Sequence, residues 1–237
     1  MPSKQRHRGQ HAEDARLFGE AYLPSLREAV SDMGFLLSRG YSDSASLKLV
    51  GDRHKLTQRQ RKALLRVSCP EEAVNNRPRK QVSATDLSAQ TLAIDGYNLL
   101  ITIESALAGG MLFHCRDGCY RDIASVHGTY RKVEETLPAL KLIGDTLLEL
   151  GVEQANWFLD KPVSNSGKLK LMMIEVAKEH AFPWWIELVN NPDRTISELT
   201  DQIAISSDGW VIDHGVRWFN LQKHIVDQIE GANVIKL

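Results

Sequence analysis

The nine residues Leu92-Ala93-Ile94-Asp95-Gly96-Tyr97-Asn98-Leu99-Leu100 decide the fold of this chain. Their apolar side chains, which follow polar Ser, Thr and Gln residues, predict a buried strand. An unpaired carboxylate is costly to bury, so we expect Asp95 to lie where the strand opens onto a polar site with a cation or strong donors. The alternative is that Asp95-Gly96 forms a hairpin turn with Asn98 at its polar edge.

The composition is that of an ordinary globular protein, since 43% of the 237 residues are hydrophobic and 25% are charged. No apolar run approaches the roughly 18 residues of a membrane span, and the polar, basic N-terminus does not predict a secretory signal. Three cysteines suit a reducing compartment, so we expect a cytoplasmic location. His114, Cys115 and Cys119 have the spacing of half a zinc site, but no second pair matches them, and zinc is not expected.

The near-neutral total charge hides an asymmetry along the chain. Residues 1–90 contain 16 Lys and Arg against 10 Asp and Glu, a balance of +6, and residues 91–237 contain 13 against 20, a balance of −7; the two sum to −1. We would expect this division of charge if the basic half of the chain held a polyanion and the acidic half held metal ions. Chance partition of surface charge is the alternative.

The first part of the chain is predicted to be a small all-helical domain. Residues 12–37 have helical apolar spacing, and Pro24 predicts either a kink or two helices in series. Thr57 and Gln60 have the spacing of a capping box, which predicts a helix over residues 58–68. This helix carries a basic stripe that could hold phosphates or be a merely solvated face: Arg59, Lys62 and Arg66. Residues 75–84 are polar, basic and Pro-containing, which predicts a linker.

The second part alternates strands with helices, which predicts right-handed crossovers and a mostly parallel sheet. Further strands are expected at residues 156–160, 184–189 and 203–209, and helices at 136–150, 164–180 and near 221–229. After Gly109-Gly110, a short apolar stretch and the turn Arg116-Asp117-Gly118 predict a β-ribbon or a lid.

Three of the predicted strands carry or end on an aspartate: Asp95, Asp160 and Asp208. The carboxyl ends of parallel strands lie on one edge of a sheet, so these side chains should converge. Oxygen ligands without paired His or Cys favour Mg²⁺ or Mn²⁺, which can activate water for attack on a phosphodiester. For each aspartate, capping of the following helix is the alternative. Further acids that could complete the shell are Asp122, Asp193, Asp201 and Asp213, and Glu104 is a weaker candidate.

The segment Val163-Ser164-Asn165-Ser166-Gly167-Lys168 is not a Walker loop, because its spacing departs from that motif. Ser164, Ser166 and Lys168 nevertheless stand at a predicted helix start beside the site, where they could hold a substrate phosphate. The five tryptophans are expected mostly in the core, with base stacking as the alternative for one of them.

The segments Ile94-Asp95-Gly96-Tyr97-Asn98-Leu99-Leu100 and Ile205-Ser206-Ser207-Asp208-Gly209 resemble the first and fourth strands of PIN-like and related NYN nuclease domains. The resemblance covers residues 90–230 and rests on these two short motifs. It implies a three-layer α/β/α domain, an acidic cluster that holds Mg²⁺ or Mn²⁺, and endoribonuclease activity. By this resemblance Asp95 is the first-strand metal ligand, Asp208 is the acid after the last central strand, and Asn98 orients the substrate.

The chain also departs from that pattern. PIN domains usually carry a glutamate in a middle helix and an aspartate that starts the helix before the last strand, for which Asp160 and Asp201 are imperfect substitutes. The whole chain resembles, in addition, a two-part family of uncharacterised prokaryotic proteins. We expect a helical basic domain with its linker at residues 1–84 and a PIN-like α/β domain at residues 85–237.

These observations predict a cytoplasmic, Mg²⁺- or Mn²⁺-dependent endoribonuclease. Asp95, Asp160 and Asp208 would hold the metal with Asn98 beside them, and the N-terminal helices would hold the RNA backbone. One alternative is a catalytically inactive RNA-binding or toxin-neutralising module on the same fold. A second makes the N-terminal helices a surface for a homodimer or a partner protein, with no membrane partner in either case.

Overall fold

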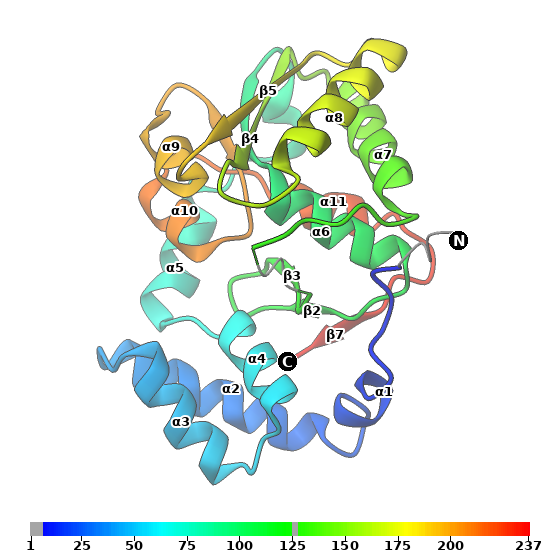
Figure 1. The fold of residues 1–237 in the computed structure, drawn as a ribbon. Helices are drawn as coiled ribbons and strands as arrows, with labels where there is room; N and C mark the ends of the chain where they lie inside the picture. Colours follow the sequence, from blue (N-terminus) through cyan, green and yellow to red (C-terminus); the bar gives the residue numbers. More distant parts are fainter. Residues whose placement is uncertain (1–6, 125–127) are drawn as a thin grey trace.

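The chain folds into an α/β unit with a helical region at its N-terminal end, shown in Figure 1. The structure is a computed structural model that describes residues 7–124 and 128–237. The N-terminal region consists of α1 (Asp14–Leu17), α2 (Leu23–Ser38), α3 (Asp43–Arg53), α4 (Gln58–Val67) and α5 (Glu71–Lys80), and the 3₁₀ turn η1 (Ala84–Leu87) follows it.

Two of the predicted helix starts are confirmed. Pro24 lies in the first turn of α2, where its missing N–H is not needed, so residues 12–37 form two helices in series. Thr57 and Gln60 form the complete capping box of α4. The predicted linker is wrong in its first half, because residues 71–80 form α5 with Pro78 inside it.

The opening stretch is a strand followed at once by a helix. Strand β1 (Thr91–Asp95) ends at the aspartate, and helix α6 (Gly96–Leu107) begins at the next residue. Asp95 is the N-cap of α6, since its side chain accepts a hydrogen bond from the backbone N–H of Asn98 at 3.4 Å. The prediction of a strand through Leu100 is therefore wrong, and so is the hairpin alternative.

The central sheet is fully parallel and has the strand order β5-β4-β1-β6. Its other strands are β4 (Gln154–Asp160), β5 (Trp184–Val189) and β6 (Ile203–Ile205). The helices that alternate with them are α7 (Thr136–Glu149), α8 (Ser166–His180), α9 (Pro192–Glu198), α10 (Gly209–His214) and α11 (Leu221–Val226). The predicted α/β architecture with a mostly parallel sheet and a preceding helical region is confirmed.

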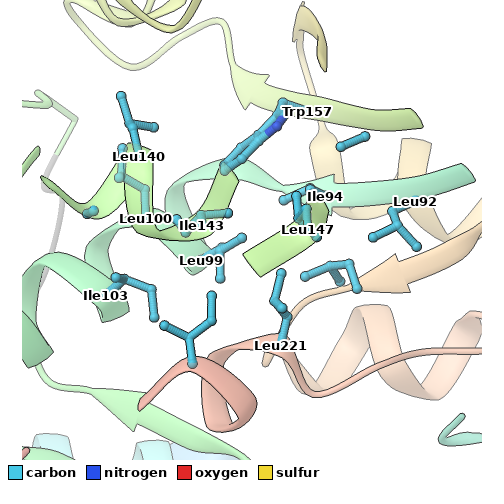
Figure 2. Close-up of a cluster of buried hydrophobic side chains, with 14 of the residues drawn as sticks. Leu92, Ile94, Leu99, Leu100, Ile103, Leu140, Ile143, Leu147, Trp157 and Leu221 are labelled. Atoms are coloured by element: carbon cyan, nitrogen blue, oxygen red, sulfur yellow. The ribbon is translucent and has the colours of Figure 1, made fainter. Parts of the chain in front are cut away.

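Alternate residues of the strands face opposite layers of helices. Leu92, Ile94 and Trp157 belong to a buried cluster with side chains of α6, α7, α8 and α11, part of which is shown in Figure 2. Ala93 and Phe158 point the other way, into a smaller cluster with α9 and α10. Both faces of the sheet are covered, which leaves its strand ends as the exposed polar edge.

A second, three-stranded sheet joins the helical region to the α/β unit. It contains β2 (Leu112–His114), β3 (Tyr120–Asp122) and the C-terminal β7 (Val234–Lys236), in the order β3-β2-β7. The predicted ribbon is thus the hairpin of β2 and β3, and Phe113 from it packs edge-to-face on Phe18 of the helical region. In the described parts of the chain, no helix is both long and apolar enough to cross a membrane.

Candidate functional site

The site lies at the carboxyl ends of β1 and β6, where the strand order reverses. From β1 the chain moves outward through β4 and β5, and it returns to the other side of β1 with β6. Ligands of open α/β sheets bind in the crevice at such a switch point. Asp95 ends β1 on one side of this crevice, and Asp208 follows β6 on the other, as the N-cap of α10.

Asp95 and the loop that carries Asp208 are tied together by one serine. The Ser206 hydroxyl donates to Asp95 Oδ2 at 2.8 Å and accepts from the backbone N–H of Asp208 at 2.9 Å. Asp208 Oδ1 in turn accepts from the backbone N–H of Trp210 at 2.8 Å. Asp95 and Asp208 therefore both cap the helix that follows them, as the alternative from the sequence allowed. The second carboxylate oxygen of Asp208, Oδ2, takes no part in these hydrogen bonds.

Four aspartates, rather than three, are electrostatically linked at this edge, with Asp193 between Asp160 on one side and Asp95 and Asp208 on the other. Burial, reinforced by the charges of Asp193 and Asp208, raises the pKa of Asp95 to about 8, against the opposing hydrogen bonds from Ser206 and Asn98. Burial, with the charges of Asp208 and Asp160, raises the pKa of Asp193 to about 6. Burial also raises the pKa of Asp160 at the end of β4. The pKa of Asp193 is thus affected by aspartates after two different strands, Asp208 after β6 and Asp160 at the end of β4.

The donor chemistry of this cluster suits a hard divalent cation. Within residues 7–124 and 128–237, no three His, Cys, Asp or Glu side chains are close enough together to ligate one ion directly. Mg²⁺ is usually held by one or two carboxylates and retains several waters, so such an ion would need only one or two of the four aspartates as direct ligands. Burial raises the pKa of Asp95 most, and the charges of Asp193 and Asp208 add to it; a cation would offset both effects.

Asn98 holds the β6–α10 loop in place. Its Oδ1 accepts three hydrogen bonds, from Ser207 N at 2.8 Å, from Ser207 Oγ at 2.9 Å and from Gln222 Nε2 at 2.7 Å. The side-chain oxygen is therefore fully used within the protein. Asn98 positions the segment that carries Asp208, and its oxygen is not available to orient a substrate as the sequence predicted.

A buried charge network supports the same loop from the other side. Asp117, in the β2–β3 turn, accepts hydrogen bonds from both Arg77 of α5 and Arg121 of β3. Arg121 Nε donates to the carbonyl of Ser207 at 2.7 Å, and Arg77 packs against Gly209. The two arginines hold the pKa of Asp117 near 2 despite its burial. The helical region thus contributes directly to the position of Asp208.

Three of the further acids have other partners or positions than the cluster. Asp122 is buried at the end of β3, where Thr102 donates to its Oδ2 at 2.9 Å, and it does not contribute to the raised pKa of Asp95. Asp213 forms a bidentate ion pair with Arg77, with both distances 2.7 Å. Asp201 precedes β6 and so lies at the opposite, amino edge of the parallel sheet. None of the three affects the pKa of Asp95 or Asp193: Asp122 is bound to Thr102, Asp213 lines the same cavity as Asp208 but is paired with Arg77, and Asp201 lies at the other edge.

The predicted basic stripe of α4 divides into residues with different roles. Arg59 pairs with the buried Asp14 of α1, with Nη2 to Oδ2 at 2.7 Å, and so has a structural role rather than a binding one. Lys62 and Arg66 line a cavity of about 280 Å³ with Asn98 and Asp122. Arg66 also lines a second cavity of about 460 Å³ that reaches Asp208. The stripe therefore borders the acidic edge through Arg66, and Lys62 borders the adjoining cavity beside Asn98.

The predicted phosphate-holding segment does follow Asp160 at the acidic edge. Ser166 is buried and donates to the carbonyl of Lys161 at 3.2 Å, which makes it a structural residue of the β4–α8 turn. Ser164 and Lys168 are exposed on either side of the start of α8. A phosphate contact from this segment would thus come from Lys168 or Ser164 and not from the Ser166 hydroxyl.

Sequence reasoning gave too little weight to two residues of the site. Asp193 was only one of several further acids, although Asn191-Pro192-Asp193 directly follows β5 and has the cap and proline of a helix start at the same edge. Tyr97 belongs to the opening apolar stretch, yet its buried hydroxyl has no hydrogen-bond partner within the described chain, and burial, with the charge of Asp160, raises its pKa. Glu104, by contrast, is a buried structural residue that binds Arg8, Tyr130 and Thr136.

Comparisons with known proteins divide the chain at the same region where the helices give way to the α/β unit. Residues 25–80 match the family described as "Protein of unknown function (DUF434)". An uncharacterized protein of Methanocaldococcus jannaschii is 28% identical over 208 residues, which cover 88% of this chain and 96% of that protein. No solved structure matches the chain at a significant level. Residues 84–224, more than half of the chain, match a second family model, and the chain therefore belongs to the family described as "Domain of unknown function (DUF5616)".

Proposed function

We propose that this protein is an endoribonuclease of the PIN-like type that depends on Mg²⁺ or Mn²⁺. The observation that carries the proposal is the cluster of Asp95, Asp160, Asp193 and Asp208 at the carboxyl edge of the sheet, in which burial, with the charges of neighbouring aspartates, raises the pKa of Asp95 and of Asp193. Clusters of perturbed acids in a crevice are typical of functional sites. The motifs around Asp95 and Asp208 that resemble PIN-like nucleases support the same reaction.

Each aspartate has a role that follows from its position. Asp95 and Asp208 flank the switch-point crevice and would hold the cation, with Asp193 and Asp160 completing its hydrated shell from the neighbouring side. When bound, such an ion lowers the pKa of its water and neutralises the charge that develops on a phosphodiester. Ser206 and Asn98 keep Asp95 and the Asp208 loop in register through the hydrogen bonds described above.

The surroundings of the cluster favour a polyanionic substrate. Arg66 of α4 borders the cavity that reaches Asp208, and Lys62 borders the adjoining one. Arg66 Nε donates to the backbone carbonyl of Asp122 at 3.3 Å. Because this acceptor is uncharged, the contact does not neutralise the charge of the guanidinium. A cation held by the aspartates and a guanidinium opposite them would contact successive phosphates of one strand.

The test is cleavage of end-labelled RNA in Mn²⁺ or Mg²⁺ by the wild type and by Asp95→Asn and Asp208→Asn variants. Each substitution keeps the side-chain volume and removes the charge, so we expect at least about a hundredfold loss of cleavage, the scale of losing one charge-stabilising group. Asp201→Asn is the matched control, because it removes the same charge from the opposite edge of the sheet. It should cleave like the wild type.

Equal cleavage by Asp95→Asn and the wild type would overturn the assignment of the site. A wild-type protein that binds RNA in EDTA, keeps that affinity when Asp95 is replaced, and never cleaves would overturn the nuclease proposal. That result is the one expected of a binding module on the same fold.

A further inference from the structure

Trp210 is a large aromatic side chain kept at the surface beside the acidic cluster. It follows Asp208 by two residues in α10, and its indole is 45% exposed, whereas Trp157 and Trp218 are buried in the core. Its backbone N–H is bound to Asp208 Oδ1. The position of the ring is therefore coupled to that of a proposed metal-holding carboxylate.

The exposed indole is also held in a defined orientation. It stacks on His214, with ring centroids 4.1 Å apart and an interplanar angle of 21°. His214 is itself fixed by a hydrogen bond between its Nδ1 and the carbonyl of Trp210 at 2.8 Å. One face of the indole is covered by the imidazole, and a second flat group can stack only on the other face.

The cavity beside this ring combines three kinds of groups. It has a volume of about 460 Å³, within the usual range of ligand sites, and Trp210 and Asp208 line it from α10 and the preceding loop. Arg66 and the exposed Leu65 of α4 and the half-buried Leu37 of α2 line it from the helical region. Two further acids also line it, Asp43 of α3 and Asp213, which pairs with Arg77. A ligand that stacks on Trp210 and pairs with Arg66 needs a flat apolar part and an anionic part next to each other, and it must reach Arg66 beside these acids.

A nucleotide within a single strand has both parts. Its base can stack on an exposed indole, an interaction that is tolerant of sequence, and its phosphate can accept hydrogen bonds from a guanidinium. In a duplex the bases are paired and already stacked on one another, so they cannot reach the ring without being unpaired. A pocket with one aromatic platform therefore selects single-stranded over double-stranded nucleic acid.

We propose that Trp210 is the base-stacking residue of a single-stranded RNA cleft between α4 and α10, in which Arg66 holds an adjacent phosphate. This inference rests on the proposed function, because it assigns the substrate strand of the same site. Trp210 and Arg66 would then select single-stranded over double-stranded RNA, whereas the aspartates would hold the cation for cleavage. The N-terminal helical region is then one wall of the substrate site.

The test measures binding without cleavage, by fluorescence anisotropy in EDTA with a labelled single-stranded RNA of about 10 nucleotides and its duplex. Trp210→Ala should weaken binding of the single strand by at least about fivefold, and Trp210→Phe should retain most of the affinity. Trp185→Ala is the matched control, since Trp185 is 62% exposed on the edge strand β5, away from the cavity, and its loss should change nothing. Arg66→Gln should make the slope of log K against log salt concentration shallower by about 0.7, which is the contribution of one phosphate of a single strand.

Unchanged affinity in folded Trp210→Ala protein, or equal binding of the duplex, would overturn the inference. Absence of RNA binding by the wild type would do the same and would leave the cavity to a peptide or another ligand. The outcomes are separable from those of the nuclease test. Cleavage that depends on Asp95 but binding that ignores Trp210 refutes only this inference, and Trp210-dependent binding without cleavage refutes only the nuclease proposal.

Discussion

At the scale of single residues, opposing influences meet at Asp95. Hydrogen bonds from Ser206 and from the backbone of Asn98 favour the ionised carboxylate, whereas burial and the charges of Asp193 and Asp208 favour the protonated form. Burial and the two neighbouring charges have the larger effect, and they raise the pKa of Asp95 to about 8. Without a cation, Asp95 therefore keeps its proton at neutral pH, and a bound cation would displace it.

This raised pKa predicts an unusual pH dependence of stability in the metal-free protein. The native state keeps the Asp95 proton up to about pH 8, while the unfolded chain loses it near the ordinary aspartate pKa of 3.8. Between these values the native state binds more protons, so the free energy of unfolding must fall as pH rises, by at most about 1.4 kcal/mol per pH unit for one proton. Asp193, with its pKa raised to about 6, adds to the decrease below that pH.

The measurement is urea denaturation in EDTA at several values between pH 5 and pH 8 for the wild type and for Asp95→Asn. The variant has no proton to lose at this position, so its free energy of unfolding should fall less steeply with rising pH. Asp201→Asn, exposed and at the opposite edge, should keep the wild-type slope. A slope in Asp95→Asn equal to that of the wild type would show that Asp95 is ionised in the native protein.

Residue type and position allowed part of the site to be predicted from the sequence. An aspartate directly after an apolar strand is visible without a structure, so Asp95, Asp160 and Asp208 could be placed together at one edge. The role of Arg59 could not be seen, because its partner Asp14 is 45 residues earlier in the chain. Ionic partners that are distant in sequence leave no local pattern, and a stripe on one helix does not tell which of its charges are neutralised.

At the scale of elements, the junction of β1 and α6 shows why a buried helix can be taken for a strand. Leu99, Leu100 and Ile103 are all fully buried, so α6 has no polar face near its start and the helical period is hidden. Gly96 is required at the junction, since a Cβ there would lie 2.5 Å from Leu159 Cδ2 and 3.0 Å from the carbonyl of Phe158. Tertiary packing, rather than local preference, therefore sets the end of the strand.

The turn between β2 and β3 predicts a large effect of a single charge. Asp117 is buried between Arg77 and Arg121, and Asp117→Asn would leave both guanidinium groups without that carboxylate. Removal of one partner from a buried ion pair costs about 3–5 kcal/mol. We expect a loss of this order in the free energy of unfolding, together with weaker cleavage, because Arg121 holds the carbonyl of Ser207 in the Asp208 loop.

Asp213→Asn is the control for that prediction, since Asp213 also pairs with Arg77 but its side chain is 42% exposed. Exposed ion pairs contribute at most about 1 kcal/mol, so this variant should be destabilised far less. Chemical denaturation of both variants beside the wild type gives the comparison. Equal losses in the free energy of unfolding would mean that burial of Asp117 does not increase its contribution to stability.

At the scale of the whole molecule, the helical region and the α/β unit share one hydrophobic core. Phe18, Met33 and Leu64 from the helical region belong to the same buried cluster as Phe113 of β2 and Met111, which directly precedes that strand. The buried network of Arg77, Asp117 and Arg121 crosses the same boundary. The division of the chain by sequence pattern therefore does not imply two parts that fold independently.

This shared core predicts that the full chain unfolds in one cooperative transition and that residues 85–237 alone are much less stable. Removal of the helices would expose Met111, Phe113 and Ile123, which are now at most 7% exposed, and burial of each such side chain contributes about 1.5–3 kcal/mol. Calorimetry of the full chain and of the fragment gives the test, with Phe113→Ala in the full chain expected to cost about 3–5 kcal/mol. Phe35→Ala, at a side chain 59% exposed on α2, should cost little. Two separate transitions in the full chain, or a fragment as stable as the whole, would contradict a shared core and would make the helical wall of the proposed cleft a movable one.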